Sequence, residues 1–247
     1  MCGRYAVITN PEALRALFRY FEQPNFPPRY NVAPTQPVPI ARVVEGKREF
    51  ALVRWGLIPP WVNDPRAFSL LINARGESAT EKPAFKNAMK RRRCLFPADG
   101  FYEWKRDGER KQPYFVRLKG GGPLAFAGLW ESWMGPNGEE QETAAIVTTA
   151  ASPSISFIHD RMPVIVSPDA FDFWLDPNVD GETAAAVLAP APDAQLEFFP
   201  VSSAVNRTAN DTPALLEPLT APEPVEPPKP KAKKERQKAD DGQASLF

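Results

Sequence analysis

The stretch CLFPADGFYEWKRDGERKQPYFVRLKGGGPLAFAGLWESW, residues 94–133, alternates short apolar runs with Gly, Pro and Asp. Its runs 94–104, 113–118 and 124–133 are rich in Val, Phe and Trp, and runs of this kind between turn-forming residues are typical of strands. Three consecutive glycines at 120–122 separate the last two runs. We therefore expect residues 111–118 and 123–133 to pair as a β-hairpin.

Outside this stretch, further strand-like runs occur at 38–44, 50–58, 144–149 and 163–166. Helices are fewer: residues 11–21 carry apolar side chains at helical spacing behind Asn10, a good N-cap residue, and 82–92 and 168–175 each have a proline near their first turn. The links between strands are too short for regular βαβ crossovers. The sequence therefore predicts one α+β domain over residues 1–219 with a mostly antiparallel core.

The composition limits the partners and cofactors of the chain. It has 247 residues, 43% of them hydrophobic, and its 30 basic residues balance 30 acidic ones, so a nucleic-acid partner would have to be recognised by a local patch. Two cysteines and one histidine are too few for a disulfide framework or a structural zinc site, and we expect no metal and no cofactor. Without a leader pattern or a bilayer-length apolar run, we expect a soluble, cytoplasmic, monomeric protein with no membrane partner.

Residues 220–247 differ in composition from the rest of the chain, being rich first in proline and then in lysine. Such a segment buries too little apolar surface to offset its chain entropy, so we expect it to be disordered. It ends with Gln243, Leu246 and Phe247, a spacing similar to the bacterial sliding-clamp binding motif. A replication sliding clamp is therefore an expected partner, and a merely solubilising tail is the alternative.

The first chemical signal is MCGRY, residues 1–5. A residue as small as cysteine at position 2 normally permits removal of the initiator methionine, which would leave Cys2 with both a free α-amine and a thiol. Such a 1,2-aminothiol condenses with an aldehyde to an imine and then closes a thiazolidine ring, which no internal cysteine can do. The alternative is that Cys2 merely occupies a frayed terminus. Gly3 and Arg4 favour the first interpretation, because glycine lets the backbone approach a ligand and arginine suits a phosphate.

Two further motifs carry polar residues next to apolar runs. In LLINARGES, residues 70–78, Asn73 could orient an amine or carbonyl and Arg75 could clamp a phosphate, although a turn with a solvated arginine fits equally well. In PADGFYEW, residues 97–104, strand alternation puts Phe101 and Glu103 on one face. A carboxylate among aromatic residues is a candidate for a raised pKa and acid–base work; the alternative is a glutamate that faces water.

The last motif is SFIHDRMPVIV, residues 156–166, which contains the only histidine of the chain. General acid–base chemistry by an imidazole near neutral pH therefore depends on His159 alone. A histidine before a strand is often only structural, however. The next residue, Asp160, is expected either to orient His159 or to pair with Arg161.

Six stretches stand in this order along the chain: MCGRY, RYNVAP, RWGLIPPW, INARGE, PADGFYEW and IHDRMPVI. Together they resemble the SOS response-associated peptidase family, also called abasic-site processing proteins, over nearly all of residues 1–219. The resemblance implies a compact α+β domain with a curved, mostly antiparallel sheet flanked by helices. It also implies a protein that crosslinks itself through a thiazolidine to abasic sites in single-stranded DNA and shields them during the DNA damage response, when it would associate with the nucleoid.

The resemblance also implies roles for individual residues. Those implied to be catalytic are Cys2 as nucleophile, Asn73 as its positioning group, Glu103 as acid–base group and His159 as an aid to sugar-ring opening. Those implied to bind DNA are Arg4, Arg75 and Arg161 through phosphates, and Pro34 and Trp61 through bases beside the lesion. Removal of its own residue 1 and a weak strand-cleaving lyase activity are implied as accompanying reactions.

Two other functions fit the same residues. A cysteine peptidase or amidohydrolase with an N-terminal nucleophile would use Cys2, Glu103 and His159. A non-covalent single-strand binding module would need only the basic and aromatic residues. The basic run KPAFKNAMKRRRC, residues 82–94, places Lys82, Lys86 and Lys90 on one helix face, and residues 91–93 continue it. This run is either a solvated helix face or a guide for the phosphodiester backbone.

Overall fold

The structure, a computed structural model, describes residues 2–108 and 110–220. The sliding-clamp motif with Gln243, Leu246 and Phe247 lies outside the described residues. The strands are β1 (Arg4–Val7), β2 (Arg29–Val32), β3 (Pro37–Val44), β4 (Lys47–Trp55), β5 (Asn73–Arg75), β6 (Arg93–Ala98), β7 (Gly100–Asp107), β8 (Arg110–Leu118), β9 (Leu124–Met134), β10 (Glu140–Ala150), β11 (Arg161–Pro163) and β12 (Leu196–Pro200). The α-helices are α1 (Pro11–Phe18), α2 (Lys86–Arg91), α3 (Phe171–Leu175) and α4 (Gly181–Ala184).

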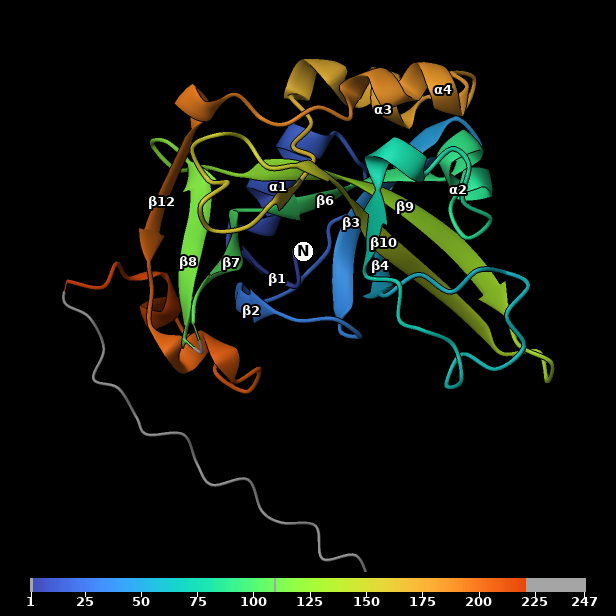
Figure 1. The fold of residues 1–247 in the computed structure, drawn as a ribbon. Coiled ribbons are helices and arrows are strands. Elements are labelled where there is room, and N and C mark those ends of the chain that lie inside the picture. The colour runs from blue at the N-terminus through green and yellow to red at the C-terminus, as the bar shows by residue number, and fades with distance from the viewer. Residues whose placement is uncertain (1, 109, 221–247) are drawn as a thin grey trace, which may run out of the picture.

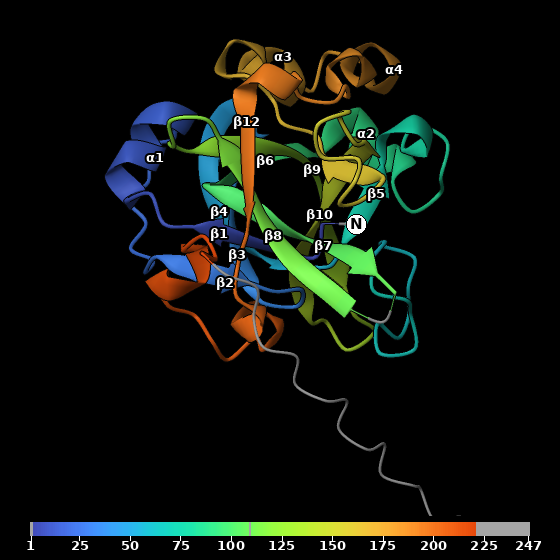
Figure 2. The same ribbon diagram turned by 60° about the vertical axis from the view of Figure 1, so that its left-hand side comes forward.

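The strands form two sheets (Figures 1 and 2). The first has the order β12-β8-β7-β1-β2 and is antiparallel throughout. The second has the order β11-β10-β4-β3-β6-β9, and an additional pairing of β9 with β10 closes five of its strands into a barrel. Only the pairings of β10 with β4 and β5 are parallel. The predicted α+β class with a mostly antiparallel core is confirmed.

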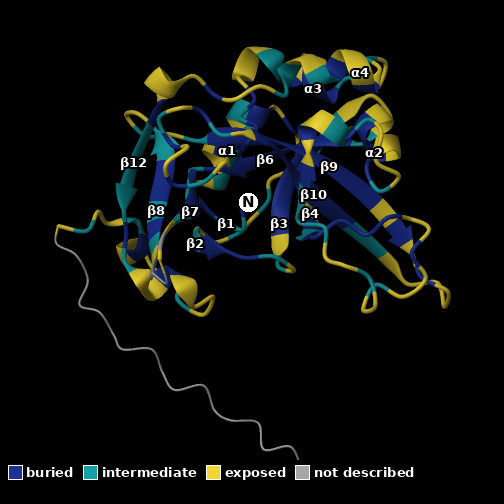
Figure 3. Ribbon diagram, viewed as in Figure 1, coloured by how far each residue is buried: buried dark blue, intermediate teal, exposed yellow. Residues whose placement is uncertain are grey.

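The main core lies inside the barrel and between it and the first sheet. The ring of Phe126 on β9 meets Tyr5 of β1 and Phe101 of β7, each at 5.9 Å between centroids. Figure 3 shows the strands mostly buried and the helices with exposed outer faces. A second, smaller cluster lies on the other face of the first sheet and includes Tyr102, Phe115 and Val205. The first sheet is therefore covered on both faces at β7.

The predicted hairpin of residues 111–118 and 123–133 is wrong. Strand β8 pairs with β7 and β12, whereas β9 pairs with β6 and β10 in the other sheet. The glycines at 120–122 all have positive φ, at 80°, 77° and 97°, and the turn they form passes the chain from one sheet to the other. Eight consecutive residues from Leu124 are buried, so β9 requires covering on both faces, and the barrel provides it.

The apolar run 94–104 is likewise two strands. It bends at Asp99, whose carboxylate accepts the backbone N–H groups of Ile8 and Thr9 at 2.6 and 2.9 Å. At Gly100 a Cβ atom would lie 2.3 Å from the ring of Phe115, so only glycine fits. This corner sends β6 into the barrel and β7 into the first sheet, which places Glu103 three residues beyond it.

The predicted helices are shorter in the structure. Of the predicted helix 11–21, only Pro11–Phe18 form α1, which is capped by the side chain of Asn10 and ends at Arg19 with a φ of 56°. Residues 82–92 give α2 only, and 168–175 a 3-10 turn followed by α3. Among the described residues, no helix is long and apolar enough to cross a membrane.

The basic run continues across α2 only in part, which corrects the expectation for residues 91–93. Arg93 is 3% exposed, and its guanidinium donates hydrogen bonds to backbone carbonyls, among them those of Met89 and Trp174 at 2.6 Å. Arg92 pairs with the buried Glu131 at 2.7 Å. Arg93 is therefore not a solvated cation available to DNA, and Arg92, with a side chain 41% exposed, is already paired with a carboxylate.

Candidate functional site

A pocket of about 530 Å³ opens where β1 begins. The described pairing of β1 with β7 starts at Arg4 opposite Tyr102, and β7 continues past it to Asp107. Figures 1 and 2 both show the N-terminal end of the chain close to β7 and β10. The lining residues come from four parts of the chain: Gly3, Arg4, Glu103, Trp104, Arg106, Lys111, His159 and Asn206.

Cys2 precedes Gly3, a lining residue of this pocket, and is completely buried. Its Sγ lies 3.9 Å from the carbonyl oxygen of Arg4. Burial raises the pKa of the Cys2 thiol, and the negative charge of Glu103 raises it further. The thiol is therefore protonated at neutral pH, and a reaction that uses it needs a nearby acceptor for its proton.

Glu103 is that neighbouring acceptor. Its side chain lies on the same face of β7 as Phe101, as the alternation predicted, and the residue is 4% exposed. A water-facing glutamate is thereby excluded. Burial raises the pKa of Glu103 to about 7, so at neutral pH the acid and the carboxylate are both well populated. This is the range in which one group can give and take a proton efficiently.

His159 faces the same pocket from the segment before β11. Its Nδ1 lies 3.0 Å from the backbone nitrogen of Arg161 and 2.8 Å from Asp160 Oδ1. One ring nitrogen cannot accept from the first and donate to the second at the same time, so the two contacts belong to different protonation states. Burial lowers the pKa of His159, which favours the neutral ring with Nδ1 as acceptor and Nε2–H as donor. Asp160 therefore contacts His159, whereas Arg161 pairs with Glu77.

An aromatic anchor holds the segment that carries His159. The ring of Phe157 packs against Tyr114 of β8 at 5.7 Å and Phe198 of β12 at 5.3 Å. The Nζ of Lys105 on β7 lies 5.5 Å from the same ring. In the register of the sheet Tyr114 stands opposite Glu103, so these contacts pin the segment over the face of β7 that carries the carboxylate.

Asn73 and Arg75 lie on β5, which pairs with β10. Both polar atoms of the Asn73 carboxamide are buried and have no hydrogen-bond partner in the described structure. Leaving them unpaired costs free energy. Arg75 is exposed, and its positive charge helps to lower the pKa of Glu77, after the hydrogen bond from Arg161. Neither residue lines the pocket itself.

Arg161 and Arg4, both predicted to bind phosphate, are engaged within the protein. Arg161 makes a two-pronged contact with Glu77, at 2.6 and 2.8 Å, and donates to the carbonyl of Thr148 at 2.7 Å. Arg4 donates to Asn31 Oδ1 at 2.8 Å and to a backbone carbonyl of the 3-10 turn Ser203–Asn206 at 2.7 Å. A structural role for both arginines is therefore established, and phosphate binding by them stays a prediction.

The predicted base-stacking residues lie outside the pocket. Trp61 is 57% exposed, and its ring packs edge to face on Phe68 at 5.5 Å. Pro34 is half-buried in a tight turn, followed by Thr35 with a φ of 72°. Trp61 thus presents a flat apolar ring to solvent, as a stacking residue must.

Four pocket residues were missed by the sequence analysis: Trp104, Arg106, Lys111 and Asn206. Strand alternation in EWKRD could have placed Trp104 and Arg106 on one face. The meeting of Lys111 and Asn206 with them depends on the register of β8 and on the turn Ser203–Asn206, which no local pattern reveals. Among the described residues, no group of His, Cys, Asp and Glu could hold a metal ion.

Known proteins resemble this chain in sequence and in fold. The sequence profile of one family, described as SOS response associated peptidase (SRAP), matches residues 1–208. Abasic site processing protein YoqW of Bacillus subtilis is 38% identical, spanning 88% of this chain and 99% of its own. YedK of Escherichia coli, also named an abasic site processing protein, is 34% identical and spans 89% of this chain and 100% of its own. HMCES of Xenopus tropicalis, also named an abasic site processing protein, is 32% identical and spans 86% of this chain and 77% of its own.

Solved structures share the fold. A protein from Bacteroides thetaiotaomicron superposes with a TM-score of 0.80 at 24% identity, over 88% of this chain and 100% of that one. A phage-related protein from Bordetella bronchiseptica superposes with a TM-score of 0.65 at 32% identity, over 81% of this chain and 94% of that one. The arrangement of two sheets is therefore one already found in crystals.

Proposed function

Since this chain belongs to the SOS response associated peptidase (SRAP) family, we propose that it recognises abasic sites in single-stranded DNA and crosslinks itself to them through Cys2. Relatives that span nearly the whole chain are named abasic site processing proteins. One observation carries the proposal: the second residue of the chain is a buried cysteine whose pKa is coupled to Glu103, in a pocket that His159 also lines.

The proposed reaction requires prior removal of Met1, so that Cys2 gains a free α-amine. The open-chain abasic sugar is an aldehyde at C1′. The amine nitrogen bonds to C1′ to give a carbinolamine, which loses one water to form an imine. The thiol sulfur then bonds to the same carbon while its proton passes to the nitrogen, which closes the thiazolidine ring. The product contains the protein and the DNA less one water.

The polar groups of the site have separate proposed roles. His159, as a donor through Nε2–H, assists opening of the closed sugar ring. Glu103, with a pKa of about 7, assists water loss and then accepts the thiol proton. The unpaired carboxamide of Asn73 positions the α-amine of Cys2. Because the thiol is protonated when free, attack by the amine precedes attack by sulfur.

The DNA strand is proposed to bind through Arg4, Arg75 and Arg161 at phosphates and through Pro34 and Trp61 at flanking bases. Arg75 is the exposed cation among them, and we expect it to contribute most to binding. For Arg161, phosphate binding competes with Glu77, so its contribution is smaller.

Two accompanying reactions belong to the same proposal. The trapped imine can undergo β-elimination, which breaks the C3′–O bond and leaves a nicked strand, so a weak lyase activity is expected beside the crosslink. The Cys2, Glu103 and His159 set also suits removal of residue 1 by the protein itself, the activity that a peptidase name describes. We place the protein in the cytoplasm, at the nucleoid during DNA damage.

The test is the intact mass after mixing with an abasic single-stranded oligonucleotide. We expect one species equal to processed protein plus oligonucleotide less one water, stable on a denaturing gel. Fragments of casein without any DNA adduct would instead establish the peptidase or amidohydrolase. Complexes that dissociate on denaturing gels and at high salt would establish a non-covalent binding module.

The C-terminal motif is proposed to bind a bacterial sliding clamp. A short extended peptide would place Leu246 and Phe247 in an apolar pocket and Gln243 at its edge, and so raise the local concentration of the protein at replication gaps. Deleting residues 243–247 should leave crosslinking to free oligonucleotides unchanged and remove affinity for purified clamp in calorimetry. A tail peptide that fails to bind clamp at high micromolar concentration would refute this part.

A further inference from the structure

Two cations of the β7–β8 hairpin stand opposite each other. Arg106 and Lys111 are directly opposite in the strand register, and both are exposed. Neither makes an ion pair or hydrogen bond with any side chain that the structure describes. Like charges at opposite positions of an antiparallel pair destabilise it. On the same sheet, by contrast, Arg117 of β8 is matched with Glu197 of β12 at 2.6 Å.

Both cations line the pocket that holds Glu103 and His159. Trp104, two residues before Arg106, lies on the same face of β7 and lines the same pocket. Its ring nitrogen donates to Asn206 Oδ1 at 2.8 Å, which fixes the orientation of the ring. A held aromatic ring beside two cations is the combination that proteins use for the bases and backbone of single-stranded nucleic acid.

We infer that Arg106 and Lys111 together bind one backbone phosphate of the DNA strand, next to the nucleotide whose sugar enters the pocket. The anion would lie between two like charges and offset their repulsion. The inference rests on the proposed function for the identity of its ligand, a single-stranded phosphodiester. It adds a phosphate site on β7 and β8, elements other than β1, β5 and β11, which carry Arg4, Arg75 and Arg161.

Occupation of this site would act on His159. Burial lowers the pKa of His159 most, and the positive charges of Arg106 and Arg161 lower it further. The chain's amino terminus lowers it too, and only Asp160 raises it. A phosphate bound at Arg106 offsets one of these repulsions, so the pKa of His159 rises when DNA binds. The protonated form of the imidazole, which is the acid, would then be more populated with DNA bound than without it.

The first experiment measures binding of an undamaged oligothymidine by fluorescence anisotropy over a range of salt concentrations. The double variant Arg106→Gln with Lys111→Gln should bind more weakly, with a log–log salt slope smaller by about 0.7, the value for one phosphate of a single strand. Arg106→Lys should keep most of the slope. Arg117→Gln, a cation removed from the same strand but matched by Glu197, is the control and should keep all of it.

The second experiment uses the single histidine of the chain, which gives one imidazole signal in NMR. Adding the oligothymidine should raise the pKa of His159 in the wild type and in Arg117→Gln, and leave it unchanged in the double variant. A salt slope unchanged by the double substitution, a pKa that still rises in it, or a wild type that does not bind the oligothymidine would each overturn the inference. Both measurements use undamaged DNA, so failure to crosslink would refute the proposed function and leave this result standing.

Discussion

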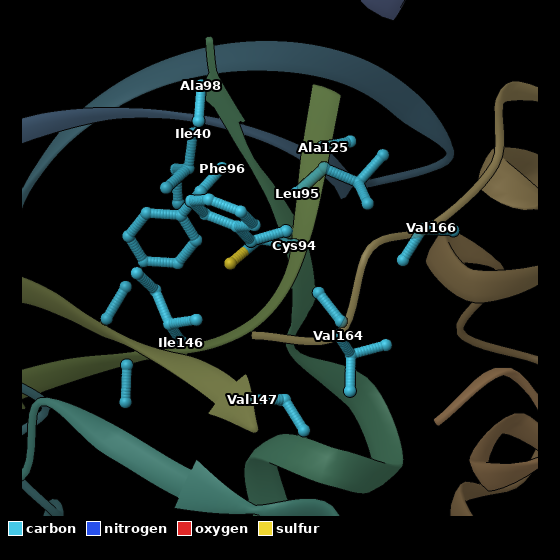
Figure 4. Packing of buried hydrophobic residues seen from close by; sticks show 14 of the residues in the cluster. Ile40, Cys94, Leu95, Phe96, Ala98, Ala125, Ile146, Val147, Val164 and Val166 are labelled. Carbon is cyan, nitrogen blue, oxygen red and sulfur yellow. The ribbon is translucent and has the colours of Figure 1, made fainter. Parts of the chain in front are cut away.

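The two cysteines occupy very different regions although their burial is the same. Cys2 and Cys94 are both completely buried, and burial raises the pKa of each thiol. Figure 4 draws apolar members of the core cluster around Cys94, such as Phe96 and Ile146, and the charge that acts on this thiol is the positive one of Arg42, which lowers its pKa against the effect of burial. Beside Cys2, the carboxyl of Glu103 raises the thiol pKa further, and a polar pocket begins one residue away at Gly3.

This difference shows that thiol burial alone does not indicate function. An inert core cysteine and a proposed nucleophile have the same exposure and the same direction of pKa shift. The distinguishing features are a proton acceptor with a pKa near neutrality and an α-amine, which only a residue at the chain start can offer.

The largest expected effect separates the two thiols completely. Cys2→Ser should abolish the stable crosslink to abasic oligonucleotides, because a serine cannot close the thiazolidine, although a borohydride-trappable imine should still form. Cys94→Ser should crosslink like the wild type. Retention of Met1 should remove the crosslink while leaving the thiol of Cys2 in place. Equal crosslinking with Met1 retained, measured by intact mass, would contradict the ring chemistry.

The next effect concerns the acid–base groups that Cys94 lacks. Glu103→Gln and His159→Ala should each slow crosslinking by about 10²–10⁴-fold, the usual contribution of a positioned acid–base group. Single-turnover rates at saturating abasic oligonucleotide measure this. Affinity for undamaged single strands should stay the same in both variants, whereas Arg75→Ala should weaken it. Parallel losses of affinity in all three would show that the roles are wrongly divided.

The third effect is on stability and has a defined pH dependence. Glu103 has a pKa of about 7 in the folded protein and 4.5 in the reference state, so the folded state holds the proton more tightly and wild-type stability falls as pH rises from about 4.5 to 7. Glu103→Gln removes this loss. Its stability relative to wild type should increase over that range by about 3 kcal/mol and then level off. Urea unfolding at pH 4 and pH 8 tests this; an advantage that is the same at both pH values would contradict it.

Much of the site could be predicted because it consists of short motifs with local meaning. Alternation in PADGFYEW placed Phe101 and Glu103 on one face, and the structure confirms this. The contacts that depend on the three-dimensional fold could not be predicted. The glycines at 120–122 favoured a hairpin. Strand β9 lies in the barrel instead, where its long run of buried residues is covered on both faces. Similarly, no local pattern shows that Arg161 meets Glu77, 84 positions away.

The smallest expected effect is that of Cys94→Ala. The Sγ lies in a packed interior, so its removal leaves a small void and should lower the free energy of unfolding by about 1–2 kcal/mol. The backbone carbonyl of Cys94 still accepts from Trp174 Nε1 at 2.9 Å, so the local fold is kept. Urea unfolding measures the loss, and the crosslinking rate of the same sample should equal that of the wild type. A rate that falls along with stability would mean that the core around Cys94 supports the chemistry at Cys2, and the contrast between the two thiols would then be one of degree.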